Sequence, residues 1–198
     1  MIFKALRSNI DVDDSLFNDI YPSKIKKLAE RHWTPVHVAK MAAEYLVESP
    51  MDKVLDIGAG AGKFCLVGAS CTNGMFYGVE QRESLVELSN GLAEKHQVQN
   101  VAFIHANIDE ICFSDYDAFY FYNSFYENID TSSPIDYAIQ PDPKLYHAYT
   151  ECLRNRLALL PIGTRVVSYW SGWEEIPCNF DLEYTACDGF LNFWRKLG

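Results

Sequence analysis

The sequence predicts an α/β fold: a three-layer α/β/α sandwich around a mostly parallel seven-stranded sheet. Two observations carry this prediction. Strand-like and helical runs alternate from residue 53 to residue 170, and two further strand-like runs follow them. Strands that alternate with helices form parallel sheets whose two faces are both covered by helices. The chain has 198 residues, of which 48% are hydrophobic, and this is room for one compact domain.

The expected elements follow one another in a regular order. A short helix is expected over residues 22–30, and a second helix follows, with Thr34 as its N-cap and Pro35 as its first residue. Parallel strands are expected at 53–57, 75–79, 101–104, 117–122 and 164–170, with helices at 63–70, 83–96 and 143–160. The last two strands, 180–186 and 190–197, flank Cys187-Asp188-Gly189, which predicts an antiparallel hairpin.

The most informative segment runs from Val54 to Gly62, where a strand turns through three glycines into a helix. Such a turn presents backbone N–H groups and the positive end of a helix dipole to a ligand. The spacing differs from the dinucleotide fingerprint, because Lys63 stands where that pattern requires a third small residue. It also differs from a P-loop, because Phe64 takes the place of the Ser or Thr that binds magnesium.

A carboxylate ends the second expected strand. Glu80 follows Asp56 by 24 residues, a normal reach for one strand-helix-strand step. At that place its side chain lies beside the glycine turn and can accept hydrogen bonds from both hydroxyls of a ribose. The turn and Glu80 together predict a ligand that contains adenosine.

The pattern Asp56-x-Gly58-x-Gly60-x-Gly62 resembles motif I of the class I S-adenosylmethionine (SAM) dependent methyltransferases. The resemblance extends over most of the chain and includes the acidic second-strand end and the terminal hairpin. It implies a Rossmann-like fold, SAM as cofactor, and transfer of a methyl group to an acceptor, possibly a nitrogen. The chain departs from the family in leaving little room for a helix between the fifth strand and the hairpin.

The resemblance also implies which residues hold the cofactor. Trp33 covers it and Thr34 donates to its carboxylate, while Asn107 meets the adenine amino group and Ile108 packs on the ring. Two simpler readings stay open: Thr34 only caps its helix, and Asn107 only caps the turn that follows it. The full expected set is Trp33, Thr34, Pro35, Asp56, Gly58, Ala59, Gly60, Gly62, Glu80, Gln81, Asn107, Ile108 and Asn123. Residues 1–50 are expected to pack on a core of residues 51–198 and to cap this site.

The acceptor is expected at the end of the fourth strand. Amino-group methyltransferases often carry Asn or Asp, two prolines and an aromatic residue there; Asn123-Ser124-Phe125-Tyr126 keeps the first and last but lacks both prolines. Asn123 could aim the lone pair of an amine, and Tyr126 could stabilise the cationic product. The alternative is an ordinary turn. The long segment 127–142 is expected over this site, with Tyr126, Tyr137, Trp170 and Trp173 as candidates for an aromatic lining.

The net charge of −10 argues against general binding of nucleic acid, so a small molecule or protein is favoured as acceptor over nucleic acid. Two readings of the basic stretch 24–31 stay open: a local patch that binds nucleic acid and, more commonly for such a stretch, a solvated helix face. No apolar run is long enough for a membrane span, and the six scattered cysteines predict reduced, mostly buried thiols of a cytoplasmic protein without a metal site. Two other functions stay open: a SAM-binding protein without catalysis and an NAD-dependent oxidoreductase.

Overall fold

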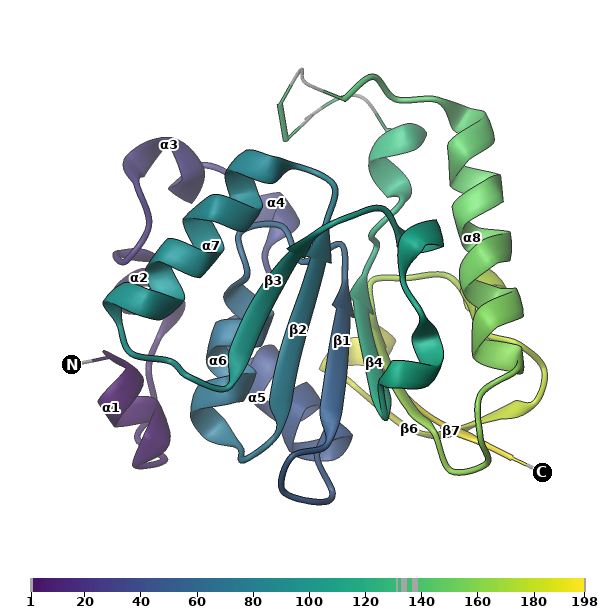
Figure 1. Ribbon diagram of the computed structural model, residues 1–198, viewed down its shortest axis with the longest axis horizontal. Coiled ribbons are helices and arrows are strands. Elements are labelled where there is room, and N and C mark those ends of the chain that lie inside the picture. The colour runs from purple at the N-terminus through teal and green to yellow at the C-terminus, as the bar shows by residue number, and fades with distance from the viewer. Residues whose placement is uncertain (1, 131, 133–134, 137–138, 198) are drawn as a thin grey trace.

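Seven strands form one sheet in the order β3-β2-β1-β4-β5-β7-β6 (Figure 1). The computed structural model describes residues 2–197 except 131, 133–134 and 137–138. The strands are β1 (Lys53–Ile57), β2 (Met75–Glu80), β3 (Val101–His105), β4 (Ala118–Tyr122), β5 (Arg165–Tyr169), β6 (Phe180–Ala186) and β7 (Leu191–Lys196). β1 to β5 are parallel to one another, whereas β7 runs antiparallel to both β5 and β6. The predicted sheet, including its terminal hairpin, is confirmed.

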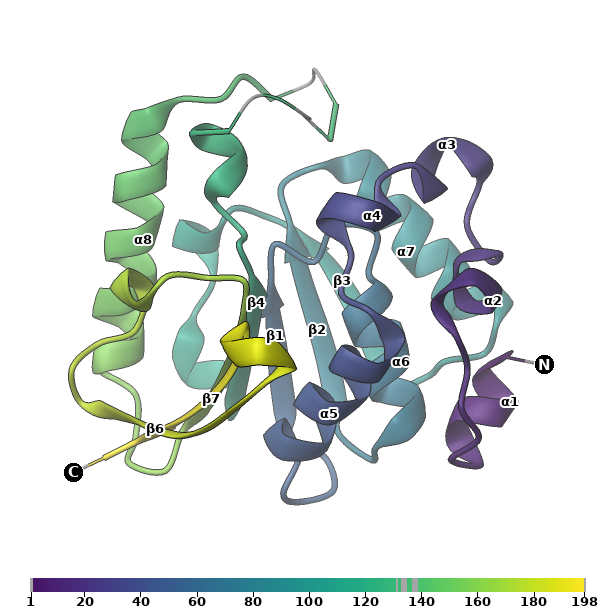
Figure 2. The ribbon, with the colours of Figure 1, turned by 180° about the vertical axis from the view of Figure 1, so that it is seen from behind.

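Helices cover both faces of the sheet (Figures 1 and 2). They are α1 (Ile2–Arg7), α2 (Asp14–Asn18), α3 (Ser23–Lys26), α4 (Ala29–His32), α5 (Val36–Leu46), α6 (Lys63–Cys71), α7 (Glu83–Lys95) and α8 (Pro143–Ala158). The apolar residues of α1, α5, α6 and α7 join one buried cluster with one face of the sheet. Those of α8 and of short 3-10 turns join a second cluster with the other face. The predicted three-layer sandwich is therefore present.

The alternation of side chains along β1 explains how one strand serves two cores. Val54 belongs to the cluster under α5 and α6, while Leu55 and Ile57 belong to the cluster under α8. Side chains two residues apart share a face of a strand, so Asp56 lies on the side of Val54. There the Cys65 thiol of α6 donates a 3.4 Å hydrogen bond to it. The central strand thus carries a buried carboxyl directly before the glycine turn.

The N-terminal region differs from the sequence-based expectation. The helix expected over residues 22–30 is divided into α3 and α4, and the short helices α1 and α2 were not predicted. The expected N-cap role of Thr34 is wrong, since α5 begins at Val36. The Thr34 hydroxyl instead shares a 2.7 Å hydrogen bond with the Tyr120 hydroxyl of β4. Asp14 of α2 supplies the missing cap, because its carboxylate accepts from the Val36 N–H at 3.0 Å.

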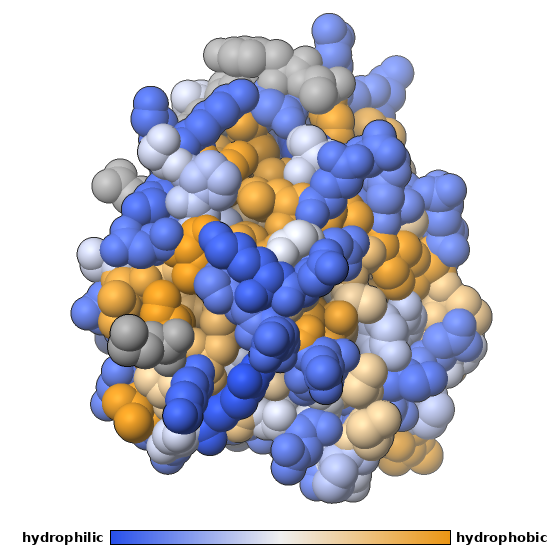
Figure 3. Space-filling view, turned by 60° about the vertical axis from the view of Figure 1, so that its left-hand side comes forward, coloured by the Kyte–Doolittle hydropathy of each residue, from blue (hydrophilic) through white to orange (hydrophobic). Residues whose placement is uncertain are grey.

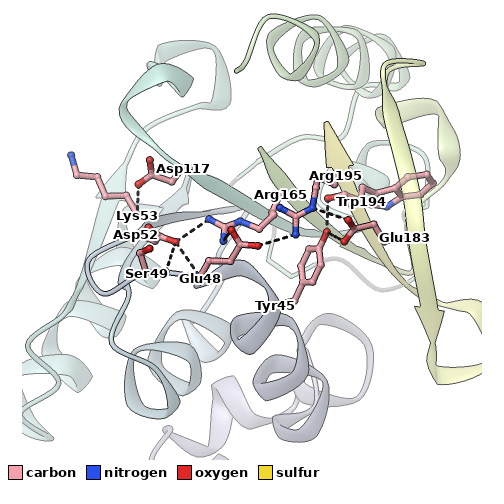
Figure 4. Close-up of polar contacts among 10 residues, drawn as sticks. All are labelled: Tyr45, Glu48, Ser49, Asp52, Lys53, Asp117, Arg165, Glu183, Trp194 and Arg195. Atoms are coloured by element: carbon pink, nitrogen blue, oxygen red, sulfur yellow. Dashed lines mark hydrogen bonds and ion pairs between the residues drawn. The ribbon is translucent and has the colours of Figure 1, made fainter. Parts of the chain in front are cut away.

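A network of charged side chains joins the segment between α5 and β1 to β5, β6 and β7 (Figure 4). Arg165 of β5 pairs with Glu48 and Asp52, both at 2.9 Å. Arg195 of β7 pairs with Glu48 at 2.9 Å and with Glu183 of β6 at 2.7 Å. Because these pairs bridge four elements, they hold the C-terminal hairpin against the sheet at the end opposite the glycine turn.

The structure also tests the expectations for the cysteines and for membrane-spanning segments. All six thiols are free, but the expectation that most are buried is wrong: only Cys65 is buried, while Cys112 and Cys178 are exposed. Among the described residues, no helix combines the length and the apolar character needed to cross a membrane.

Candidate functional site

A cavity of about 930 Å³ opens at the carboxyl ends of β1, β2 and β4. Ligands of open parallel sheets bind at this end, where the order of strands reverses between β1 and β4. Nine of the expected cofactor residues line the cavity, and Tyr126 lines it too; the nine are Trp33, Pro35, Gly58, Gly60, Glu80, Gln81, Asn107, Ile108 and Asn123. Residues far apart in the sequence are therefore brought together as expected.

The glycine turn depends on backbone conformations that other residues rarely adopt. Gly58, Gly60 and Gly62 have φ angles of +75°, +54° and +76°. A Cβ atom on Gly62 would lie 2.5 Å from the Phe103 ring, so this glycine is needed for packing, and it does not line the cavity. A Cβ atom on Gly60 would meet no described atom within 4 Å and would project into free space. Gly60 thus keeps part of the cavity open.

Glu80 closes the turn from the neighbouring strand. Its Oε2 accepts a hydrogen bond from the Gly60 N–H at 3.0 Å, and its Oε1 accepts from the Arg82 N–H at 2.9 Å. Burial raises the pKa of this carboxyl, while the two N–H groups and the Arg82 charge oppose the rise. Each carboxylate oxygen has more than one acceptor position, so both can still accept from a ligand hydroxyl.

A second, small hollow of about 30 Å³ lies beside the cavity and shares four of its residues. Three expected cofactor residues, Thr34, Asp56 and Ala59, line this hollow and not the main cavity. Burial raises the pKa of Asp56 to about 8, and the charge of Glu80 adds to the rise. Lys63, also buried, pairs with Asp14 and donates to Asn18 at 2.9 Å. These contacts fasten α2 to the helix that follows the glycine turn.

Asn107 follows β3 and caps the 3-10 turn Ile108–Glu110. Its side-chain oxygen accepts from the Ile108 N–H at 2.7 Å, and its amide nitrogen donates to the Tyr149 hydroxyl at 2.6 Å. Asn107 therefore caps this turn, which is one of the two roles that the sequence left open for it. Asn107 also lines the cavity, together with Ile108.

Asn123 stands at the end of β4 in a left-handed conformation, with a φ angle of +46°. Its backbone N–H donates to the Ser171 hydroxyl at 2.9 Å, and its carbonyl accepts from the Tyr126 N–H at 3.1 Å. Within the part of the chain that the structure describes, its side-chain amide makes no hydrogen bond. A strained residue with an available amide in a cavity is typical of a binding or catalytic position.

Arg82 is a site residue that the sequence reasoning missed. Its guanidinium, 4% exposed, donates to Glu127 at 3.1 and 2.6 Å and to Asp136 at 3.2 Å, and it lies 3.5 Å from Glu80. Glu127 and Asp136 belong to the segment that follows β4. One buried cation therefore connects the carboxylate beside the glycine turn to the segment expected over the acceptor.

A second arginine meets the same segment from the other side. Arg31 of α4 contacts the Asp130 carboxylate at 3.4 Å and the Ser132 hydroxyl at 3.3 Å. The Arg31 carbonyl accepts from the Tyr122 hydroxyl of β4 at 3.0 Å. The described part of segment 127–142 is thus held at both edges of the cavity.

The expected aromatic lining is present in part. Tyr126 and Trp170 line the cavity, whereas Trp173 does not, and Tyr137 lies outside the described residues. Trp170 has a φ angle of +49° and stacks on Phe190, with ring centroids 3.7 Å apart. Trp173 packs edge-on against Trp194. An aromatic surface therefore borders the cavity beyond Asn123.

Comparison with known proteins gives a family match. The sequence pattern of a family described as a methyltransferase domain matches residues 48–148, just over half of the chain. A curated protein, the 23S rRNA (uracil(1939)-C(5))-methyltransferase RlmD of Vibrio cholerae, is 34% identical over 74 residues. That stretch covers 37% of this chain and 17% of RlmD, so most of the relative has no counterpart here.

Solved structures resemble the fold at lower identity. TrmN from Thermus thermophilus has a TM-score of 0.62 and 22% identity, over 87% of this chain and 52% of TrmN. An RNA methyltransferase from Salinibacter ruber, solved with S-adenosyl-L-homocysteine, has a TM-score of 0.57 and 20% identity, over 83% of this chain and 92% of the other. The chain thus spans about half of TrmN.

These relatives correct one expectation. RlmD and the Salinibacter ruber protein are named as RNA methyltransferases, so the preference for a small molecule or protein over nucleic acid is wrong. That preference rested on the net charge of −10. Net charge averages over the whole surface, whereas an acceptor meets only the surface around the site.

Proposed function

Since this chain belongs to the class I SAM-dependent methyltransferases, we propose that it transfers the SAM methyl group to a nitrogen of an RNA base. SAM, the methyl donor of that family, supplies when bound an electrophilic methyl group on a positively charged sulfur. The observation that carries the proposal is that Glu80 and Asn123 line one cavity, at the carboxyl ends of β2 and β4, the two strands that flank β1. The family assignment leaves the oxidoreductase alternative without support.

The residues present fit SAM. Glu80 would accept the two ribose hydroxyls, and the free space at Gly60 would admit the ligand close to the backbone. Gln81 and Ile108 would border the adenine ring. The small hollow beside Asp56 and Thr34 would lie next to the polar end of the methionine part. We also propose that residues 1–50 cap this site, because Trp33 and Pro35 line the cavity from the N-terminal side.

Asn123 is the proposed positioning group for the acceptor. Its amide oxygen would accept a hydrogen bond from an exocyclic amine and aim the nitrogen lone pair at the reacting carbon. Tyr126, 43% exposed, would face the base and stabilise the positive charge that develops on nitrogen. Glu127 is occupied by Arg82, so its role is to position the segment, and the proton released from the amine would go to water.

RNA is proposed as the acceptor class on two supports. Relatives of this chain are named for methylation of RNA. The cavity is also bordered by aromatic rings, including Tyr122, Tyr126 and Trp170, and aromatic rings stack on unpaired bases. A base has to leave its stack before an enzyme can reach it, and such a border would hold it outside the stack.

The test is transfer of a labelled methyl group. Purified protein is incubated with SAM carrying tritium in its methyl group and with total cellular RNA, which is then digested to nucleosides. We expect label in a methylated nucleoside, and loss of that label in Asn123→Ala while SAM affinity stays within about threefold, since Asn123 acts on the acceptor. Label that survives ribonuclease treatment in the protein fraction, or no label with intact SAM binding, would contradict the proposal. The second outcome would favour the non-catalytic alternative.

A further inference from the structure

We propose that the surface formed by Lys24, Lys27 and Arg31, here called the α3–α4 surface, binds the phosphate backbone of the RNA strand whose base enters the cavity. This inference rests on the proposed function and adds to it the path along which the acceptor arrives. It chooses between the two readings that the sequence left open for the basic stretch 24–31, a local patch and a solvated helix face.

Charge is distributed unevenly along this chain. Residues 23–32 hold four of the 17 Lys and Arg residues and one of the 27 Asp and Glu residues, a local charge of +3. The remainder of the chain therefore carries −13, because the total is −10. Phosphates bind where lysine and arginine gather and are repelled by carboxylates. Residues 23–32 thus carry an excess of positive charge, which favours contact with a polyanion.

The three cations lie on consecutive elements that are fixed to the core. Lys24 belongs to α3, Lys27 follows that helix directly, and Arg31 belongs to α4. Ile25 and Leu28, which lie between them in the chain, are partly buried and pack against the core. The backbone that carries the cations is therefore held on the body of the protein.

Two of these cations have no competing partner. Lys24 and Lys27 are exposed, and within the described residues neither forms an ion pair or side-chain hydrogen bond. Lys26, in contrast, pairs with Asp19 at 2.5 Å. The contact of Arg31 with Asp130 is long and half-exposed, and an ion pair of that kind contributes little, so Arg31 can turn to a phosphate.

The α3–α4 surface is continuous with the cavity. Ala29, Arg31 and Trp33 line the cavity, and Figure 2 shows α3 and α4 toward the same end of the molecule as the start of α8. Figure 3 shows hydrophilic side chains interspersed with hydrophobic ones on the side of the molecule that carries α3. A strand that lies across residues 23–32 can therefore reach the cavity past Arg31.

The experiment measures how RNA binding depends on salt. A short single-stranded RNA of mixed sequence is titrated at several salt concentrations with wild type, with Lys24→Gln/Lys27→Gln, and with Lys53→Gln/Lys95→Gln. The control pair removes two exposed lysines at the other end of the sheet and leaves the net charge equal to that of the first variant. SAM binding of all three proteins, by calorimetry, reports that the fold and the cofactor site are intact.

We expect Lys24→Gln/Lys27→Gln to weaken RNA binding several-fold and to reduce the slope of log K against log salt by about 0.7 for each lysine. The control pair should leave the slope unchanged. Equal slopes in all three proteins would overturn the proposal that the α3–α4 surface binds RNA. Methylation of RNA by wild type would still support the proposed function in that case. A wild type that neither binds nor methylates RNA would overturn both.

Discussion

Arg82 and Glu127 face each other in a two-pronged ion pair, in which the two terminal guanidinium nitrogens donate to the two carboxylate oxygens at 3.1 and 2.6 Å. Arg82 follows β2, on the cofactor side, and Glu127 follows β4, on the acceptor side. This geometry suits arginine and not lysine, because only a planar guanidinium can present two parallel donors. The pair therefore fixes the start of segment 127–142 against the strand that ends in Glu80.

Replacement of Arg82 by lysine should separate binding of the acceptor from binding of the cofactor. Arg82→Lys keeps the positive charge near Glu80 but loses the two-pronged contact with Glu127. We expect the KM for RNA to rise or kcat to fall by about tenfold, with a SAM Kd within about threefold, because only the acceptor segment shifts. Steady-state kinetics and calorimetric titration check this. Equal losses in SAM and RNA affinity would contradict it.

Complete removal of the cation should be costly to the fold. Arg82→Met leaves the buried carboxylate of Glu80 and the partly buried carboxylate of Glu127 without their cation, and we expect the free energy of unfolding to fall by about 3–5 kcal/mol. Adding Glu127→Gln should restore part of this loss, since it removes one of the unpaired charges. Urea denaturation of wild type, both single variants and the double variant measures the coupling. Simple additivity of the two changes would contradict the account.

Gly60 offers a test of the cavity with a closely matched control. Gly60 and Gly163 both have positive φ angles, of +54° and +88°, and a Cβ atom on either would meet nothing within 4 Å. Each change to alanine should therefore cost about 1–2 kcal/mol of stability through backbone strain. Only Gly60→Ala places its methyl group in the cavity, so only this variant should lose SAM affinity, at least tenfold. Equal SAM affinity of the two variants would show that the ligand lies elsewhere.

We expect the left-handed conformation of Asn123 to lower the stability of the fold, while its side chain serves methyl transfer. Asn123→Gly relieves the left-handed backbone at +46° and should raise the free energy of unfolding by up to about 1 kcal/mol, while methyl transfer is lost. Gln97, with a φ angle of +55° and an exposed side chain, provides the control. We expect the Gln97→Gly variant to gain a similar free energy of unfolding and to keep full methyltransferase activity. Retained activity in Asn123→Gly would remove Asn123 from the acceptor site.

The buried carboxyl group of Glu175 should make the stability of the protein depend on pH. It is 4% exposed, its Oε2 has no hydrogen-bond partner in the described residues, and burial raises its pKa from 4.5 to about 7. Between these two values the unfolded chain releases a proton that the folded protein retains, so ionisation increasingly favours unfolding as pH rises. Glu175→Gln should therefore stabilise the protein by about 1–3 kcal/mol at about pH 8 and by less at about pH 5.5. A stabilisation that is equal at both pH values would contradict this origin.

The strands and the glycine turn could be predicted from the sequence because their signals are local. Val54 to Gly62 carries its own strand, turn and helix start, and Glu80 follows at the normal distance for the next strand. The helices α1 and α2 were missed because five or six residues are too few to show a helical period. The same reason explains the division of the helix expected over residues 22–30.

Long-range contacts account for the rest. Thr34 has the sequence context of an N-cap, yet its hydroxyl meets Tyr120, 86 residues later, and the cap comes from Asp14. The Arg82–Glu127 pair joins residues 45 apart, and no local pattern marks either of them. The acceptor class was misjudged because the sequence gives the net charge but not where the cations gather on the surface.

The central claim is that Glu80 and the glycine turn form a SAM site, and calorimetric titration with SAM tests it most directly. Wild type and Glu80→Gln are each titrated with SAM and, for contrast, with NADH. We predict SAM binding that weakens at least tenfold in Glu80→Gln, which corresponds to about 1.4 kcal/mol, and no binding of NADH. Equal SAM affinity in the two proteins, or binding of NADH without SAM, would contradict the account.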